Sequence, residues 1–378
     1  TGTVLPAVSP NPLATADQQA LDALAIDVNT TFAAALAATK VQATAACVAA
    51  RQQLPSTEAQ ASLASSMDEL QFASIQKVVN GDVYHPKVYW VNAPPRTWFD
   101  GVKVPGSRYS YDNPDNLYRL IPIDGAGGSA YLIHGQRHGK GPSDTTFSLI
   151  NNANTQGTVA VLSGSDLVVN ADGSYTVTVD ADAANGRANH LQSTAQAVQL
   201  FVRNNLADWG SETADTLSVE RVGGDGGHAA QTEAEVVANS IVSFQQAIAA
   251  YCVGALGVKT MTQTVNTLAQ PQQSSTLGTL VTQANTFGHF QISDDQALVV
   301  TVRLGGAGYF VLPVSNPWMI SVAPDRETNS LNQAQSVPDA DGLYRYVIAP
   351  RDPGVWNWVD TGGLHEGTMF LRWQNLPA

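Results

Sequence analysis

Apolar residues recur at three- and four-residue spacing over residues 13–80 and again after Thr232, which is the period of an amphipathic helix. Pro55 interrupts the first stretch, and a Thr-x-x-Glu capping box opens the second. The pattern predicts an antiparallel helical hairpin within residues 1–81 and a helical insert with a linker within 223–285.

The rest of the chain consists of short segments rich in β-branched and aromatic residues, divided by Gly, Asn, Asp and Pro. This texture is typical of β-strands. It predicts two antiparallel β-modules, over residues 82–222 and 286–378. Asp172-Gly173 lies between two of these segments and predicts a hairpin turn.

The two β-modules share an internal pattern. Each module has an Asp-Gly turn, then an Asn ahead of a strand, then an Arg within a closing strand. These elements are Asp172-Gly173, Asn189 and Arg203 in the first module and Asp341-Gly342, Asn357 and Arg372 in the second. The spacings between them agree within one residue. Ordered elements at matching spacing indicate duplication. The repeated Asn is expected to bond backbone groups, and each Arg to pair with acids of its own module.

A looser upstream match aligns the segment from Leu117 to Tyr131 with the segment from Ala297 to Tyr309. Under this alignment, the second-module counterpart of the strand around His134 reads Phe310-Val-Leu-Pro-Val and has no ionisable side chain. The chemistry is therefore expected mainly in the first module.

The same residues resemble a known family. The pattern of Asp341-Gly342, Asp352-Pro-Gly354, Asn357-Trp358 and Phe370-Leu-Arg-Trp373, with the upstream segment Tyr111-Asp-Asn-Pro-Asp-Asn-Leu-Tyr-Arg119, is similar to the signature of the domain of unknown function family 1214. Trp358 is His190 in the first copy. The resemblance implies a jelly-roll-like β-sandwich with flanking helices and supplies no reaction. We therefore expect an α+β fold of two tandem antiparallel jelly-roll-like modules related by duplication.

Composition narrows the classes of partner. Hydrophobic residues make up 44% and charged residues 13% of the 378 residues, and the formal net charge is -13. So acidic a surface disfavours nucleic acid, and the apolar runs are too interrupted to predict a membrane span. Cys47 and Cys252 are expected to be buried small residues, with a disulfide as the alternative. The first residues do not resemble a signal peptide. The compartment stays open between cytoplasm and secretion, and the oligomeric state stays open too.

The first candidate site is Tyr131-Leu-Ile-His134-Gly-Gln136-Arg-His138. Alternate residues of a strand share a face, so His134, Gln136 and His138 would point the same way, with the two imidazoles about 7 Å apart. They could serve as acid and base. The alternative is a pair of surface or structural histidines. No acid falls in phase as a third ligand, so no metal is expected.

The second candidate is the segment from Arg108 to Arg119, which mixes tyrosines, acids, amides and arginines as ligand pockets do. Its candidate catalytic residues are Arg108, Tyr109 and Asp115, and its candidate substrate-binding residues are Tyr111, Tyr118 and Arg119. Asn-Pro-Asp-Asn within it is also ordinary turn chemistry. A third candidate is a group of tryptophans that would hold a glycan if exposed, or fill the core if buried, at Trp90, Trp98, Trp318, Trp356, Trp358 and Trp373.

Two functions follow from these candidates. The first is an enzyme that acts on a small neutral organic or sugar-like substrate by acid–base chemistry, as a lyase, isomerase or hydrolase. No dinucleotide, P-loop or nucleophile-elbow motif is visible, so no cofactor is expected. The second is a non-catalytic protein that binds a glycan or a partner chain. The location of His134 separates them, because a pocket around it favours catalysis.

Overall fold

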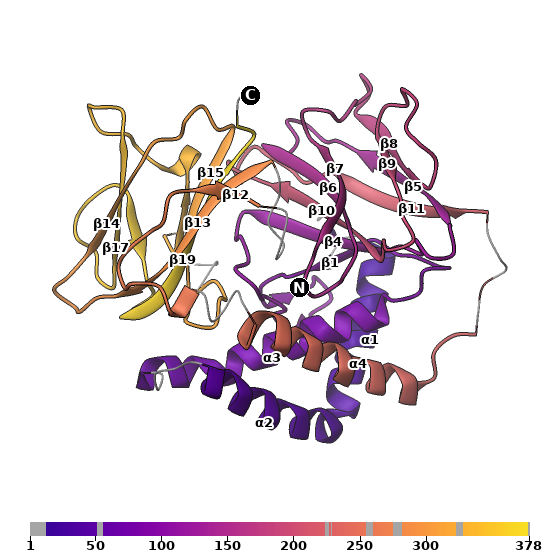
Figure 1. Ribbon diagram of the computed structural model, residues 1–378, viewed down its shortest axis with the longest axis horizontal. Coiled ribbons are helices and arrows are strands. Elements are labelled where there is room, and N and C mark those ends of the chain that lie inside the picture. The colour runs from indigo at the N-terminus through magenta and orange to yellow at the C-terminus, as the bar shows by residue number, and fades with distance from the viewer. Residues whose placement is uncertain are drawn as a thin grey trace, which may run out of the picture.

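The computed structural model describes residues 13–50, 56–223, 227, 229–254, 260–274, 282–322 and 328–376. Four α-helices lie along one side of two β-modules (Figure 1). They are α1 (Ala16–Thr31), α2 (Ala33–Ala50), α3 (Thr57–Val79) and α4 (Glu233–Ala247), and a π-helical turn, η1 (Ile248–Cys252), extends α4.

Side-chain caps begin three of the helices. The hydroxyls of Thr15, Ser56 and Thr232 accept backbone N–H groups of the first turn, and Thr232 forms the expected capping box with Glu235. The predicted hairpin is wrong in one respect, because the first segment forms two helices and three helices precede the β-strands. The break falls at Phe32, after Asn29-Thr-Thr31, where short polar and β-branched side chains disfavour helix.

The first β-module contains two facing sheets. One has the strand order β1-β4-β10-β6-β7 and the other β11-β5-β8-β9. Their bounds are β1 (Tyr89–Val91), β4 (Asn116–Pro122), β5 (Ala130–Gln136), β6 (Asp144–Ile150), β7 (Thr158–Ser163), β8 (Ser174–Asp180), β9 (His190–Gln192), β10 (Gln199–Asn205) and β11 (Thr216–Val222). A small separate ribbon joins β2 (Arg96–Thr97) and β3 (Lys103–Val104).

The second β-module repeats this arrangement with one strand fewer. Its sheets have the orders β12-β13-β19-β15-β16 and β14-β17-β18. Their bounds are β12 (Gln272–Gln273), β13 (Gln283–Gln291), β14 (Leu298–Val302), β15 (Tyr309–Ser315), β16 (Ser330–Asn332), β17 (Tyr344–Ala349), β18 (Trp358–Asp360) and β19 (Glu366–Gln374), with a 3₁₀ turn, η2 (Gln333–Gln335), after β16. The module begins before residue 286, because β12 and β13 start inside the predicted linker.

Each module has its own apolar core between its two sheets. Ile133, Phe147 and Val202 are fully buried in the first core, and Phe310 and Tyr346 are fully buried in the second. Not every strand pair is antiparallel as predicted, since β8–β9 and β17–β18 pair in parallel. Each module thus places one parallel pair at the same position of its smaller sheet.

The strand orders correct two predictions of the sequence alignment. By position in its sheet, β14 corresponds to β5 and β15 to β6. The second-module counterpart of the His134 strand is therefore Leu298–Val302, not the strand that contains Phe310. Asp172-Gly173 does form a tight turn, with Gly173 at φ 85°, but it joins β7 and β8, which belong to different sheets. It is therefore not a β-hairpin.

The repeated asparagines hold the same position in both modules. The Asn189 amide accepts from the Val168 backbone N–H at 2.7 Å and donates to the Val168 carbonyl at 2.8 Å. The Asn357 amide does the same with Val337, at 2.9 and 2.8 Å. The predicted structural role of this Asn is confirmed, because both side chains satisfy backbone groups of a neighbouring segment.

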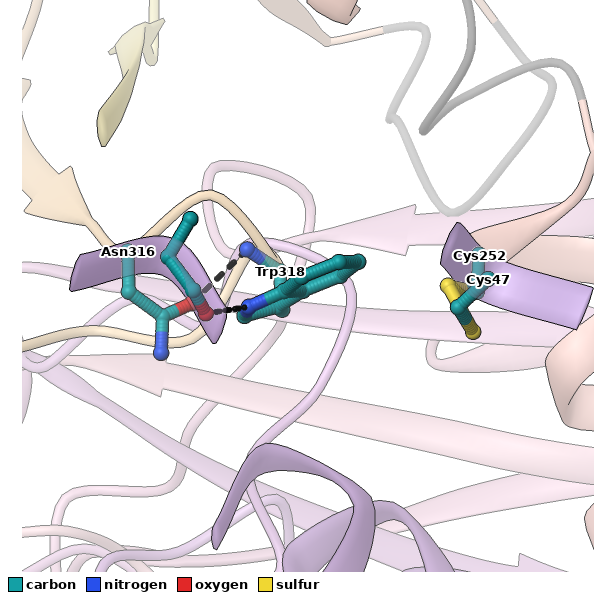
Figure 2. The surroundings of a disulfide bond; sticks show 5 residues. Cys47, Cys252, Asn316 and Trp318 are labelled. Carbon is teal, nitrogen blue, oxygen red and sulfur yellow. Dashed lines mark hydrogen bonds between the residues drawn. A yellow bond between two sulfur atoms is a disulfide. The ribbon is translucent and has the colours of Figure 1, made fainter. Parts of the chain in front are cut away.

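A disulfide joins Cys47 of α2 to Cys252 of η1, with the two Cα atoms 5.4 Å apart. Figure 2 shows the bond near Trp318, whose indole N–H donates to the Ala59 carbonyl at 2.8 Å. Both cysteines and Trp318 belong to one apolar cluster that the helices share with the second module. Both cysteines are buried, as expected from the sequence. They form the disulfide that the sequence analysis gave as the alternative to free thiols.

Replacing both cysteines with alanine is expected to lower the free energy of unfolding by about 2–5 kcal/mol. The two residues lie 205 positions apart, so the bond restricts a long loop of the unfolded chain. Urea denaturation of the double variant and of the wild type, each with and without reductant, measures the difference. Reductant should affect the wild type alone. An unchanged stability in both comparisons would contradict the prediction.

Among the described helices, α2 is long and apolar enough to cross a membrane by length and composition, with a mean hydropathy of 1.3. The sequence had predicted no such span, because polar residues interrupt the apolar runs of the chain before they reach the length of a membrane helix. Leu36, Ala43 and Cys47 of α2 are buried against the rest of the protein, and the disulfide fixes this packing. The described structure therefore uses α2 as a docked surface helix.

Candidate functional site

A cavity of about 370 Å³ lies between the two β-modules. In β10, Leu200 and Val202 face the core of the first module, so the intervening Phe201 and Arg203 project from the opposite face. In β19, Leu371 faces the core of the second module, and its neighbours line the cavity in the same way. The cavity is thus formed by the outer faces of the two larger sheets.

Two buried arginines, Arg203 and Arg372, line this cavity at equivalent positions of the two modules. Each guanidinium stacks on the phenylalanine two residues earlier, 4.2 Å from the Phe201 ring centre and 4.0 Å from that of Phe370. Burial lowers the pKa of Arg203 to about 10 and also lowers the pKa of Arg372. Both arginines stay cationic at neutral pH.

The hydrogen bonds that these arginines donate to described residues go to neutral groups. Arg203 donates to the Ser148 hydroxyl at 3.2 Å. Arg372 donates to the carbonyls of Phe370 and Tyr111. Within the described residues, no carboxylate forms an ion pair with Arg372. The prediction that it pairs with acids of its own module is therefore wrong, and its charge is solvated by carbonyls and an aromatic face instead.

Three tyrosines of the first module complete one wall, and two of them belong to a strained segment. Tyr109, Tyr111 and Tyr118 line the cavity. Ser110 and Tyr111 have φ values of 55° and 60°, a left-handed conformation that non-glycine residues rarely adopt. The Tyr111 N–H donates to the carbonyl of Met319, itself at φ 65°. Such strain concentrates at functional sites.

Amide side chains connect the modules at one end of the cavity. Asn205 of β10 donates to Gln374 of β19, its equivalent in the second module. Asn116 donates to Asn205, while its own side-chain oxygen has no hydrogen-bond partner among the described residues. The side-chain nitrogen of Asn285 is buried and lacks a described partner as well. Unpaired buried polar atoms are costly, so these two amides are available for a ligand.

The remaining lining combines aromatic, amide and hydroxyl side chains with Ala269. Phe201, Phe287 and Phe370 supply apolar surface, while Gln270 and Gln272 line the cavity and are exposed, which places its solvent side there. Among the described lining residues, the ionisable side chains are the two arginines and the three tyrosines. Burial raises the pKa of Tyr109 and of Tyr118 above their usual value, so both hydroxyls stay protonated and can donate.

Three predicted site residues of the Arg108–Arg119 segment point elsewhere. Arg108 forms an ion pair with Glu69 of α3 and donates to the Ser321 carbonyl at 2.7 Å. The Asp115 carboxylate accepts from the hydroxyl of Tyr309 at 2.8 Å, among other donors of the second module. Arg119 is buried on the opposite face of β4, where it donates to the Asp215 carbonyl. The segment therefore joins the modules, and it supplies its tyrosines with Ser110, Asn113 and Asn116 to the cavity, but not Arg108, Asp115 or Arg119.

The other predicted site lies outside the cavity. His134 and Gln136 line a shallow groove on the outer face of the smaller first-module sheet. His134 bonds the Thr176 hydroxyl at 3.2 Å, and His138 bonds the Thr216 hydroxyl at 2.7 Å. Both histidines are exposed and lie apart from the three tyrosines of the cavity. The structure therefore does not bring the two halves of the predicted catalytic set together.

The tryptophans do not form one exposed surface. Trp98, Trp318 and Trp373 are buried and Trp90 and Trp358 half-buried, whereas Trp356 is 86% exposed. Nor do three His, Cys, Asp or Glu side chains gather closely enough to hold a metal ion anywhere in the described part of the chain. Of the six tryptophans in this candidate group, only the loop residue Trp356 is exposed, so the group does not form the aromatic surface expected for a glycan.

Lys77 of α3 lies directly behind the cavity wall. Its ammonium group is 4.7 Å from the ring centre of Tyr109 and 5.7 Å from that of Tyr251. It donates to the Ala153 carbonyl at 3.3 Å and to Asn154 at 3.2 Å. Burial lowers the pKa of Lys77 from 10.5 to about 7.

The free energy of unfolding is therefore expected to rise with pH between about 7 and 10.5, with Lys77 as the cause. In this window the unfolded chain holds a proton on Lys77 that the folded chain lacks, so folding is penalised more at the lower pH. Lys77→Met should flatten the profile of stability against pH, and Lys87→Met, at an exposed lysine, should not. Identical profiles for Lys77→Met and wild type would refute the assignment.

Sequence reasoning had noted Arg203 and Arg372 but gave them a structural role. The available signal was their repetition together with the preceding phenylalanines, Phe201 and Phe370. A residue that recurs on the outward face of the same strand in both modules meets its counterpart when those faces pack together. Sequence alone did not show which sheets face each other.

Comparison with known proteins supports the fold and adds no activity. No family model matches the chain, and no curated protein matches it. A crystal structure described as that of an uncharacterized protein from Burkholderia cenocepacia is similar over 94% of this chain and 96% of its own, with a TM-score of 0.77 and 20% identity. A structure from Vibrio parahaemolyticus covers 71% of this chain and 86% of its own, with a TM-score of 0.45 and 9% identity. The chain thus has an α+β, sandwich-like fold that a solved bacterial protein shares.

Proposed function

We propose that this protein binds a small organic anion with an apolar part in the cavity between its β-modules. The observation that carries the proposal is the pair Arg203 and Arg372, two buried cations that face one cavity from equivalent strands. Guanidinium groups are suited to carboxylates and phosphates because their donors form a planar fork. A cavity of about 370 Å³ suits a small molecule.

The surrounding residues fit the same ligand. The side-chain nitrogen of Asn285 is a donor without a described partner, and the hydroxyls of Tyr109 and Tyr118 keep their protons because burial raises their pKa. Phe287 and Phe370 offer an apolar surface for the remainder of the ligand. The arginines favour an anion over the neutral substrate expected from the sequence.

Binding is better supported than acid–base catalysis. None of the described lining residues is a histidine, lysine, aspartate or glutamate, and general acid–base catalysis works best with a pKa near the operating pH. The alternative, catalysis by His134 and His138, would use the separate shallow groove. It predicts that His134→Ala and His138→Ala lose turnover while an organic anion still binds in the cavity.

The proposal is tested by thermal unfolding with benzoate, which joins a carboxylate to an apolar ring, and with benzyl alcohol as its neutral counterpart. Benzoate at one hundred times its dissociation constant should stabilise the fold by about 2.7 kcal/mol. Benzyl alcohol should have little effect. Equal stabilisation by the two compounds would favour the neutral substrate instead, and no effect of either would oppose the proposal.

We also propose that the two modules are jelly-roll-like copies of one duplicated unit and that the chain is related to the domain of unknown function family 1214. Support comes from the matching strand orders and from the shared bonding of Asn189 and Asn357. A deep alignment of homologues in which the modules align along β4–β10 and β13–β19 would test the duplication.

The disulfide favours an oxidising compartment as the place where the chain works, since cytosolic thiols are kept reduced. Of the two locations that the sequence left open, cytoplasm and secretion, we therefore propose secretion. Mass spectrometry of Cys47 and Cys252 in protein alkylated within its native cells tests this, because free thiols would contradict it.

A further inference from the structure

The smaller sheet of the second module has an open edge at the position that β11 occupies in the first module. In the first module, β11 pairs with β5 along its whole length, from Thr216 opposite Gln136 to Val222 opposite Ala130. The equivalent of β5 in the second module is β14, which pairs only with β17 among the described strands. The outer backbone edge of β14 is therefore open in the described structure.

The sequence of β14 suits pairing and has none of the usual protection. It reads Leu-Val-Val-Thr-Val, without a charge, proline or glycine, whereas natural edge strands usually carry such residues to block association. Val299 is 55% exposed, and Thr301 is exposed as well. Val299 of β14 pairs with Val347 of β17, and Val347 pairs with Trp358 of β18. The three side chains therefore form an apolar row across the outer face of the sheet.

We propose that β14 pairs with β14 of a second copy of this chain, in antiparallel orientation about a twofold axis at Val300. The first module shows the kind of occupant that this position takes, namely an antiparallel strand. In the pair, Val299 of each copy lies opposite Thr301 of the other, and the two three-stranded sheets become one continuous sheet. This inference is independent of the proposed ligand.

Charge favours a second copy as the occupant. The chain carries a net charge of -13, but β14 itself has no charged residue, so self-pairing places no like charges in register. The exposed Arg303 follows β14 and the exposed Asp295 precedes it. Antiparallel pairing about Val300 places Arg303 of one copy opposite Ala297 of the other, two residues from Asp295, and this happens twice across the axis.

The test is the solution mass of the full chain, measured by sedimentation equilibrium over a range of concentrations. The wild type should reach twice the mass of one chain. Val299→Lys together with Thr301→Lys should leave a folded monomer, because both positions are exposed and the lysines of the two copies would face each other. Single lysine substitutions at Val41 and Val168, exposed valines on other surfaces, should leave the dimer intact.

A charge-swap experiment identifies the strand itself. A second variant, Val299→Glu with Thr301→Glu, should also be monomeric, while an equimolar mixture of the lysine and glutamate variants should recover the dimer because lysine then faces glutamate. A wild type that stays monomeric overturns the proposal, and so does a lysine variant that still forms dimers. A mixture that stays monomeric while the wild type is dimeric rules out the proposed register.

Discussion

Replacing Asp22 with alanine is expected to lower the free energy of unfolding by about 3–5 kcal/mol. Asp22 is fully buried on α1, where its carboxylate accepts from the Arg96 guanidinium at 2.8 and 2.9 Å, the Trp98 indole at 2.8 Å and the Tyr89 hydroxyl at 3.0 Å. Alanine leaves a buried cation and three buried donors, the Gln18 amide among them, without their acceptor. The partners outside α1 lie on β1, on β2 and on the residue after β2. The variant therefore removes the ion pair and hydrogen bonds by which Asp22 joins α1 to the first module.

Asp17→Ala on the same helix is the matched control. Asp17 forms an exposed ion pair with Lys87 at 3.0 Å, and such pairs contribute only about 0–1 kcal/mol. Urea denaturation of both variants gives the comparison. Equal losses for Asp17→Ala and Asp22→Ala would show that burial of the carboxylate does not matter as described.

Replacing Arg372 with methionine is expected to weaken benzoate binding about 10- to 100-fold, the loss that follows from removing one or two charge-assisted hydrogen bonds. Stability should change little, by about 1 kcal/mol or less, because removing a desolvated charge offsets the loss of its bonds to the Phe370 and Tyr111 carbonyls. Isothermal titration of folded variant and wild type measures the affinity.

Arg345→Met serves as the control for this result. Arg345 belongs to the same module but forms exposed ion pairs with Asp339 and Asp341, away from the cavity. Its replacement should leave benzoate affinity unchanged. If Arg345→Met and Arg372→Met weaken binding equally, the effect reflects the net charge of the protein and not the cavity.

Local features of the fold were predictable from sequence. The capping box at Thr232 marked a helix start, because a side-chain cap is a local interaction. The repeated Asn189 and Asn357 were assigned their structural role for the same reason. The break at Phe32 was missed because the apolar spacing continues across it, so only the weaker helix preference of Asn29-Thr-Thr31 signalled it.

The candidate site was less predictable because it depends on which surfaces meet. His134 and His138 were placed on a shared strand face, but nothing local indicated that this face is the outer one. The role of Arg372 depends on the packing of β19 against a module that lies far earlier in the sequence. The alignment error at β14 arose because strand count alone did not reveal that β5, not β4, is its counterpart.

The most direct test of the proposed site is a crystal structure of the protein soaked with 4-bromobenzoate, with the bromine located by its anomalous signal. The proposal predicts a bromine peak inside the cavity against Phe287 and Phe370, with the carboxylate bonded to Arg203 or Arg372. A well-occupied bromine elsewhere on the protein, with this cavity left without one, would contradict it.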